Sequence, residues 1–223
     1  MKRHFDDELK KLKDELFKMG LLVEEAIAKA VEALLKRDEK LARTVIEDDQ
    51  RINILEIKID EFGHELIALM QPTAVDLRLI TMILKLSSDL ERIGDQAVNI
   101  AEYAVVLTRE APVELRNDIP RMAELAIQAV KESLNAFIER DAVKAKQICE
   151  HDDELDALKD EAFVQLQEFM KAKPQYISQA VSLIMVAHNL ERIGDLATNI
   201  AEDTIYVAKG IDIRHHITER REN

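Results

Sequence analysis

Apolar residues recur at every third or fourth position along nearly the whole chain, which is the spacing of one buried helix face. Met19, Val23 and Ala30 belong to one such stripe. The stripes break at few places, and Asp38 and Pro72 stand at two breaks as residues suited to begin a helix. The pattern predicts six helices, at about 4–36, 39–70, 73–109, 118–139, 142–172 and 175–209.

The chain contains an internal duplication. Residues 90–102 read LERIGDQAVNIAE and residues 190–202 read LERIGDLATNIAE, identical at 11 of 13 positions. Further upstream the two halves align at an offset of 103, which pairs Asp49 with Asp152 and Leu55 with Leu158. We therefore expect an all-α fold of two tandem three-helix bundles, with residues 1–111 in the first and residues 112–223 in the second.

Composition agrees with long helices and narrows the class of protein. Only 5 Gly and 4 Pro occur in 223 residues, too few turn formers for a many-stranded sheet. The single Cys149 excludes a disulfide scaffold and a Cys-rich zinc module, and a free thiol suits the reducing cytoplasm. We find neither a signal peptide nor an apolar run near the roughly 20 residues of a membrane helix. The sequence thus predicts a soluble, cytoplasmic protein.

The net charge is −13, from 31 basic and 44 acidic residues. An acidic chain repels phosphate backbones, so direct nucleic-acid binding is not expected. Cations or basic partner surfaces fit this charge better. No basic amphipathic segment is evident, so peripheral membrane association would be indirect, for instance through bridging cations.

The duplicated segments each carry polar side chains at intervals of four residues beside their apolar seam. Residues at this spacing share one helix face, and like charges there destabilise a helix unless something neutralises them. In the first copy these residues are Glu91, Asp95 and Asn99. In the second copy they are Glu191, Asp195 and Asn199.

Counting outward from the helix turns supplies partners for these acids. The turn near residue 71 should bring Asp49 and Asn53 level with the acids at 91 and 95. The turn near residue 173 should likewise bring Asp152 and Asp156 opposite the acids at 191 and 195. Two independent hairpins thus predict the same arrangement of carboxylates.

Carboxylates that converge from neighbouring helices, with few His and no usable Cys, suit hard cations such as Mg, Ca, Mn or Fe. The predicted ligands are Asp49, Asn53, Glu91, Asp95, Asn99, Asp152, Asp156, Glu191, Asp195 and Asn199. The alternative is a solvated acidic face whose acids pair with neighbouring arginines. Gly94 and Gly194 indicate either close approach of another helix at a tight site or an inherited packing contact.

The repeated motif, together with QPTAVDLR at residues 71–78 and VIEDD at residues 45–49, resembles the PhoU family of phosphate-transport regulators. The resemblance covers residues 5–210 and implies two three-helix bundles. It also implies acidic metal sites, with multinuclear Fe or another divalent cation such as Mn, Mg, Zn or Ca. By resemblance, the partners are a sensor histidine kinase and the ATPase subunit of the phosphate ABC transporter. Family members restrain the kinase and modulate the transporter when phosphate is plentiful. A homodimer is expected.

Two positions depart from the family pattern. Asn53 stands where the helix-two motif often has Asp, which predicts a weaker or differently ligated first site. The second half has Ile177-Ser-Gln where the first has Asp76-Leu-Arg78.

Two rival functions remain open from the sequence. One is a carboxylate-bridged metalloenzyme of the di-iron type, but only one E-x-x-H motif, Glu61 to His64, is evident where such sites need two. The other is a structural adaptor whose acids are only surface. No Gly-rich phosphate loop is present, so ATP hydrolysis is not supported. The resemblance implies a regulator that is not an enzyme.

Overall fold

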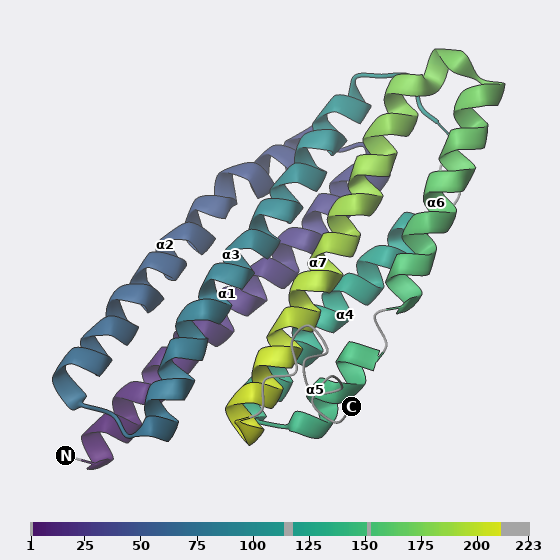
Figure 1. Ribbon diagram of the computed structural model, residues 1–223. Coiled ribbons are helices and arrows are strands. Elements are labelled where there is room, and N and C mark those ends of the chain that lie inside the picture. The colour runs from purple at the N-terminus through teal and green to yellow at the C-terminus, as the bar shows by residue number, and fades with distance from the viewer. Residues whose placement is uncertain (1, 114–117, 151–152, 211–223) are drawn as a thin grey trace, which may run out of the picture.

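A computed structural model describes residues 2–113, 118–150 and 153–210 of the chain (Figure 1). Every regular element in these ranges is helical, as predicted. The elements are α1 (Lys2–Lys36), α2 (Glu39–Met70), α3 (Ala74–Thr108), α4 (Asp118–Glu139), α5 (Ala142–Glu150), α6 (Asp153–Ala172), the 3₁₀ turn η1 (Pro174–Tyr176) and α7 (Ile177–Lys209). The charged tail that follows lies outside the described residues.

The helix boundaries have local causes that the sequence signals. The Asp38 carboxylate accepts a hydrogen bond from the Leu41 N–H at 3.0 Å and so caps the start of α2. Gln71 takes a left-handed conformation at the end of α2, with φ of 47°, and Pro72 follows it. Gly210 ends α7 in the same conformation, with φ of 71°. These caps place the hairpin turns where the residue counts expected them.

The helix predicted at 142–172 is described on both sides of residues 151–152, as α5 and α6. Both stretches pack against α4 and α7. Ala142, Ala145 and Ile148 of α5 join a small separate cluster with residues of α4 and α7. Leu155 and Ala162 of α6 belong to the main core. The sequence pattern gave the helical phase but did not reveal that α5 contributes to a cluster separate from the main core.

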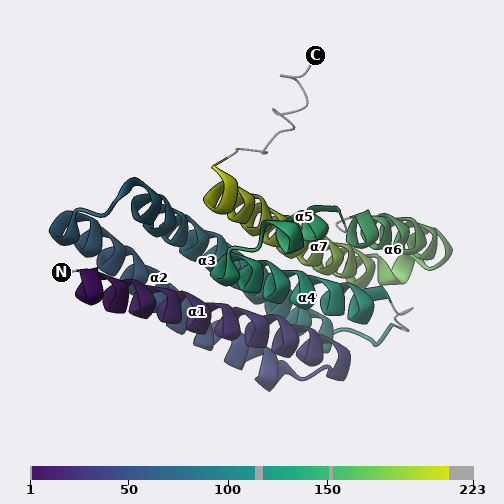
Figure 2. The same cartoon turned by 90° about the horizontal axis from the view of Figure 1, so that it is seen from below.

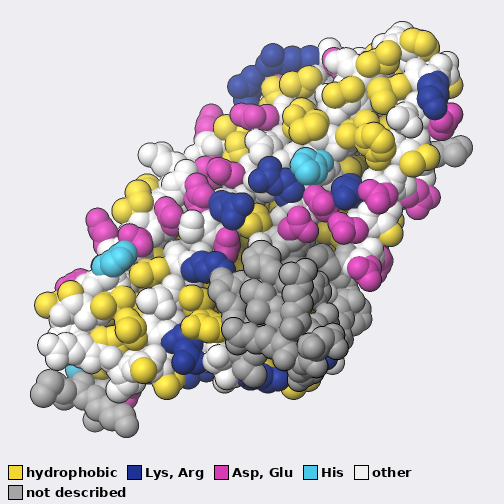
Figure 3. All heavy atoms as spheres, in the orientation of Figure 1, with side chains coloured by type: hydrophobic (Ala, Val, Ile, Leu, Met, Phe, Trp, Pro, Cys, Tyr) yellow, Lys and Arg dark blue, Asp and Glu magenta, His cyan; other side chains and the backbone are white. Residues whose placement is uncertain are grey.

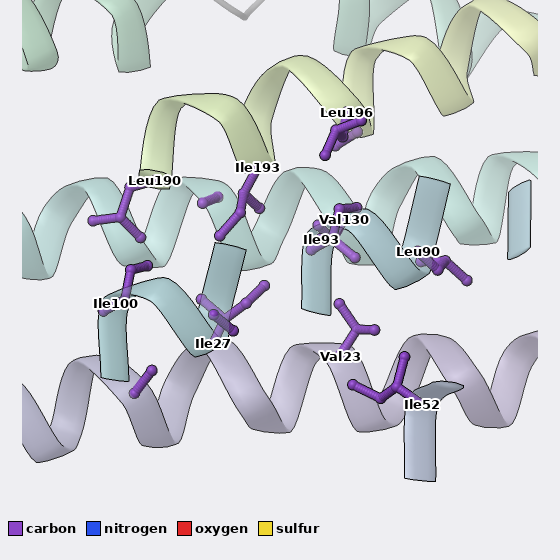
Figure 4. Packing of buried hydrophobic residues seen from close by; sticks show 14 of the residues in the cluster. Val23, Ile27, Ile52, Leu90, Ile93, Ile100, Val130, Leu190, Ile193 and Leu196 are labelled. Carbon is purple, nitrogen blue, oxygen red and sulfur yellow. The ribbon is translucent and has the colours of Figure 1, made fainter. Parts of the chain in front are cut away.

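Two three-helix units lie side by side and share one core. α3 packs against α7 and α1 against α4 across the two units (Figure 2). Buried side chains from both units meet in a single cluster, in which Ile52, Ile93, Val130 and Ile193 come from four different helices (Figure 4). The tandem-bundle prediction is therefore confirmed, with the two bundles joined through a continuous apolar interior.

The surface carries two kinds of feature on the face seen in Figure 3. Acidic side chains gather along α2 and α3 and again beside α6 and α7, below hydrophobic side chains at the upper end of these last two helices. The exposed hydrophobic residues of α6 and α7 are Phe163, Val164, Ile177 and Val181. Among the helices that the structure describes, none has a stretch both long enough and apolar enough to cross a membrane.

Candidate metal sites

The first acid group lies where α2 approaches α3. Asn53 donates a hydrogen bond from Nδ2 to Asp49 Oδ2 at 2.9 Å, one helical turn away. A Cβ atom added at Gly94 would lie 3.3 Å from Asp49 Oδ1 and 3.1 Å from Ile52 Cδ1. A glycine at this level of α3 therefore lets α2 come close, and the predicted close approach is confirmed for this half.

Negative charge accumulates in this group, which we define as Asp49, Glu56, Glu91 and Asp95. Burial, followed by the charges of Asp95, Glu56 and Asp49, raises the pKa of Glu91 above its ordinary value, and Arg92 only partly opposes this. The pKa of Asp49 is also raised, chiefly by burial, with Asp95 adding to the effect against the hydrogen bond from Asn53. Asp49 Oδ1 is buried without a hydrogen-bond partner. The group is thus short of positive charge.

The second acid group consists of Asp156 on α6 with Glu191 and Asp195 on α7. Each of the three offers a carboxylate oxygen within 4.8 Å of the others. Asp156 and Asp195 are exposed, whereas Glu191 is largely buried. The structure therefore brings together three of the predicted ligands of this half, from the two helices that the turn at residue 173 should pair.

Two side chains that sequence reasoning missed lie against this second group. Lys159 Nζ lies 3.1 Å from Glu191 Oε1 and 3.9 Å from Asp156 Oδ1. The hydrogen bond to Glu191 is the main cause of a raised pKa at Lys159. His188 Nδ1 lies 3.4 Å from Glu191 Oε2. The repeat alignment held the signal for Lys159, because the same offset of 103 places Glu56 at its equivalent position in the first half.

Of the three remaining predicted ligands, two lie elsewhere and one lies outside the described residues. Asn99 donates from Nδ2 to Asn189 Oδ1 at 3.3 Å, so its side chain contributes to the contact between α3 and α7. Asn199 is exposed on α7. Asp152 lies outside the described residues. His64, from the E-x-x-H motif, is exposed and its Nδ1 lies 2.8 Å from the backbone oxygen of Asp60.

A cavity of about 610 Å³ opens between α4, α5, α6 and α7. Gly194 lines it together with Leu155 of α6 and polar residues that include Arg121, Lys144 and Glu154. Glu154 Oε1 accepts a hydrogen bond from Arg121 Nη2 at 2.9 Å across the cavity's edge. Gly194, the repeat of Gly94, is buried and lines this cavity, whereas Gly94 meets α2.

The donor chemistry of both groups fits a hard divalent cation. The predicted ligands in both groups offer carboxylate or amide oxygens, which Mg²⁺, Ca²⁺ and Mn²⁺ prefer, although Lys159 and His188 also lie against the second group. In the first group, the buried unpartnered oxygen of Asp49 and the raised pKa values show that added positive charge would be stabilising. In the second group, three carboxylates are close enough to share one ion.

Comparison with known proteins matches the duplication. The PhoU domain family matches residues 16–104 and residues 119–204. The chain is 42% identical over 216 residues to a protein of Aquifex aeolicus, covering 96% of this chain and 98% of that one. It is 37% identical to one of Clostridium acetobutylicum over 92% of this chain and 94% of that one. Both relatives are named phosphate-specific transport system accessory protein PhoU homolog.

Two solved structures share the fold. The crystal structure of PhoU from Pseudomonas aeruginosa superposes with a TM-score of 0.89 at 38% identity, covering 93% of this chain and 100% of that one. That of the phosphate transport system regulatory protein PhoU from Streptococcus pneumoniae superposes with a TM-score of 0.88 at 29% identity, covering 93% of this chain and 98% of that one. With both repeats matched by the domain family and nearly the whole chain aligned to its members, the protein belongs to the PhoU family.

Proposed function

We propose that the protein is a non-catalytic negative regulator of phosphate uptake and of phosphate-starvation signalling. The observation that carries the proposal is the full-length similarity to proteins named as accessory to the phosphate-specific transport system. The similarity extends through both repeats, so the whole regulator and not a shared module corresponds. The protein acts in the cytoplasm, by contact with the ATPase subunit of the phosphate ABC transporter and with its sensor histidine kinase.

A protein that regulates by contact must bind the alternative states of its partners with different affinity. The net charge of −13 favours basic patches on those partners and disfavours nucleic acid. Association driven by such charge weakens as salt concentration rises. We also propose that the chain forms a homodimer and that its bundles divide at residues 111 and 112, which light scattering and limited proteolysis test respectively.

We further propose that each bundle binds metal through its acid group. The metal is multinuclear Fe or another divalent cation such as Mn, Mg, Zn or Ca. Bound metal supplies positive charge that holds the helices of a bundle together. A ligand present at 100 times its dissociation constant stabilises the folded state by about 2.7 kcal/mol. Chelator should therefore lower the melting temperature, and more strongly at low salt than at high salt, because screening relieves the repulsion among the acids.

The two sites are separable by substitution. The double variant Glu191→Ala/Asp195→Ala should lose the second site and keep the first, whereas Glu91→Ala/Asp95→Ala should do the reverse. Metal content per chain, measured on protein purified without chelator, checks this. Unchanged metal content in both double variants would contradict the assignment.

The deciding test of the regulatory role is a strain that lacks the gene, grown in high phosphate with a starvation-gene reporter. Constitutive reporter expression, reversed by the intact gene, supports the proposal, and normal repression contradicts it. Complementation with the alanine variants at Glu91, Asp95, Glu191 and Asp195 then shows whether signalling needs the acid groups or only the bundle surface. Oxygen consumption by the metal-loaded protein would instead favour the di-iron oxidase.

A further inference from the structure

We infer that Lys159 is a built-in counter-cation of the second acid group, which competes with an external cation and makes the second half the weaker cation site. The inference rests on the proposed function, since it concerns regulation of the cation sites named there. It assigns a role to a basic residue outside the carboxylate set. It also predicts that two sites descended from one duplicated sequence differ in affinity.

The position of the ammonium group is the first support. Lys159 Nζ lies 3.1 Å from Glu191 Oε1, within hydrogen-bond distance, and 3.9 Å from Asp156 Oδ1. These two carboxylates belong to the group whose oxygens lie within 4.8 Å of one another. The ammonium therefore takes an oxygen that a metal ion would use, and its charge repels a divalent cation at the remaining oxygens. The Lys159 side chain is only 28% exposed, which limits screening by solvent.

The first half supplies the contrast at the equivalent position. The repeat alignment places Glu56 where the second half has Lys159. Lys159 bonds to Glu191, which is the repeat of Glu91. One position on the middle helix thus reverses the charge that faces the repeated glutamate.

Each group also holds a buried carboxylate oxygen without a hydrogen-bond partner, Asp49 Oδ1 in the first and Glu191 Oε2 in the second. The groups therefore differ in Lys159 and not in the presence of such an oxygen. A divalent ion at the first group meets Glu56, and not an ammonium, at the position equivalent to Lys159. At the second group it must displace the Lys159 ammonium, whose long flexible stem lets it swing outward. We expect the first site to bind Mn²⁺ at least tenfold more tightly, roughly the effect of one charge-assisted hydrogen bond.

The test is a titration of the chelator-stripped full-length protein with Mn²⁺, followed by calorimetry and by the electron paramagnetic resonance of free Mn²⁺. Wild type should show a strong and a weak class of site, and Glu91→Ala/Asp95→Ala should remove the strong class. Lys159→Glu should tighten the weak class by about tenfold, and the neutral Lys159→Gln by less. The reciprocal variant Glu56→Lys should weaken the strong class and leave the weak class unchanged.

Lys171→Glu is the matched control, because it makes the same charge change on the same helix at a lysine that pairs with Glu168 at 2.7 Å. Lys159→Glu must exceed this control, or the role of Lys159 is overturned. Equal affinities of the two halves in wild type also overturn it, while leaving the proposed metal sites intact. Failure of the folded wild type to bind Mn²⁺ at all would overturn the inference together with those sites. Circular dichroism of each variant shows whether it is folded.

Discussion

The two halves carry nearly the same sequence on α3 and α7 yet surround it differently. In the first half, α2 is one helix of 32 residues that closes against Gly94 through Ile52 and Asp49. In the second half, the corresponding helical stretches are described on either side of residues 151–152, and Gly194 lines a cavity of about 610 Å³. A duplicated motif therefore does not determine its own environment, which depends on the less similar middle helix.

The charges follow the same division. Burial, followed by neighbouring acids, raises the pKa of Glu91 in the first half. Its repeat, Glu191, instead accepts a hydrogen bond from Lys159. The halves also meet asymmetrically, because Lys85 of α3 pairs with the buried Asp203 of α7 at 2.5 Å, whereas the repeat of Lys85 is Met185. The duplicated helices supply the common scaffold, and single substitutions at its edges make the halves chemically distinct.

The largest effect should come from truncating the repeated core isoleucines. Ile93 and Ile193 are both fully buried, and replacing such a side chain with alanine costs about 2–5 kcal/mol, more where the surroundings cannot relax. We expect Ile93→Ala to cost more than Ile193→Ala, because the cavity beside Gly194 leaves the second half freer to adjust. Urea unfolding of both variants measures the difference. A larger loss for Ile193→Ala would contradict the idea that the second half is the looser one.

The next effect tests the asymmetric contact between the halves. Lys85→Met should cost about 2 kcal/mol at neutral pH, because it leaves the buried acids Asp203 and Asp89 without the lysine. Burial is the main cause of the raised pKa of Asp89, and the charge of Lys85 opposes that rise. The variant should therefore raise the pKa of Asp89 further. The folded state then holds this proton more tightly than the unfolded state. This contribution to the free energy of unfolding is therefore fully present below the unfolded-state pKa of Asp89. It is lost as pH rises through the raised pKa of the folded state.

Unfolding measured at pH 5 and at pH 7.5 checks this, since the penalty of Lys85→Met should be smaller at the lower pH. Lys58→Met, at an exposed lysine whose partner is Glu15 at 3.1 Å, is the control for losing a surface pair. A pH-independent penalty would mean that the buried acids do not depend on Lys85.

Much of the fold could be predicted because its causes are local. Helical periodicity gave the long helices, and Asp38 and Pro72 marked their ends. The small cluster that Ala142 and Ala145 form with residues of α4 and α7, apart from the main core, could not be predicted. Periodicity reports the phase of a buried face and not which neighbour covers it.

The candidate sites divide in the same way. Counting from the turns correctly placed Asp49 beside Asp95 and Asp156 beside Glu191, since helical rise fixes levels within a hairpin. It could not show that Asn99 contacts the other half, because that depends on how α3 packs against α7. Lys159 is the exception, because the offset of 103 that pairs Leu55 with Leu158 also sets it against Glu56 in the sequence.

The two repeated glycines offer a smaller test of the open and closed halves. Alanine in a helix is favoured over glycine by about 1 kcal/mol, so Gly194→Ala should stabilise the protein by up to that amount where its methyl group enters the cavity. Gly94→Ala should gain less or lose stability, because its methyl group would lie 3.1 Å from Ile52 Cδ1. Thermal unfolding of the pair measures both. Equal gains at the two positions would show that α2 accommodates the added methyl group as readily as the cavity beside Gly194 does.

The smallest effect tests the charges of the two acid groups in metal-free protein. Glu91→Gln relieves repulsion with Asp95 one turn away and should stabilise by about 0.5 kcal/mol at pH 7.5, the scale of a like-charge pair. Glu191→Gln loses the ion pair with Lys159 and should destabilise by about 0.5–1 kcal/mol.

Because the pKa of Glu91 is raised in the folded state, its ionisation costs stability as pH rises through that pKa. The gain from Glu91→Gln should therefore shrink at pH 5, where wild-type Glu91 is closer to protonated. Urea unfolding in chelator at both pH values measures this, and effects of the same sign for the two variants would mean that the halves share one electrostatic environment after all.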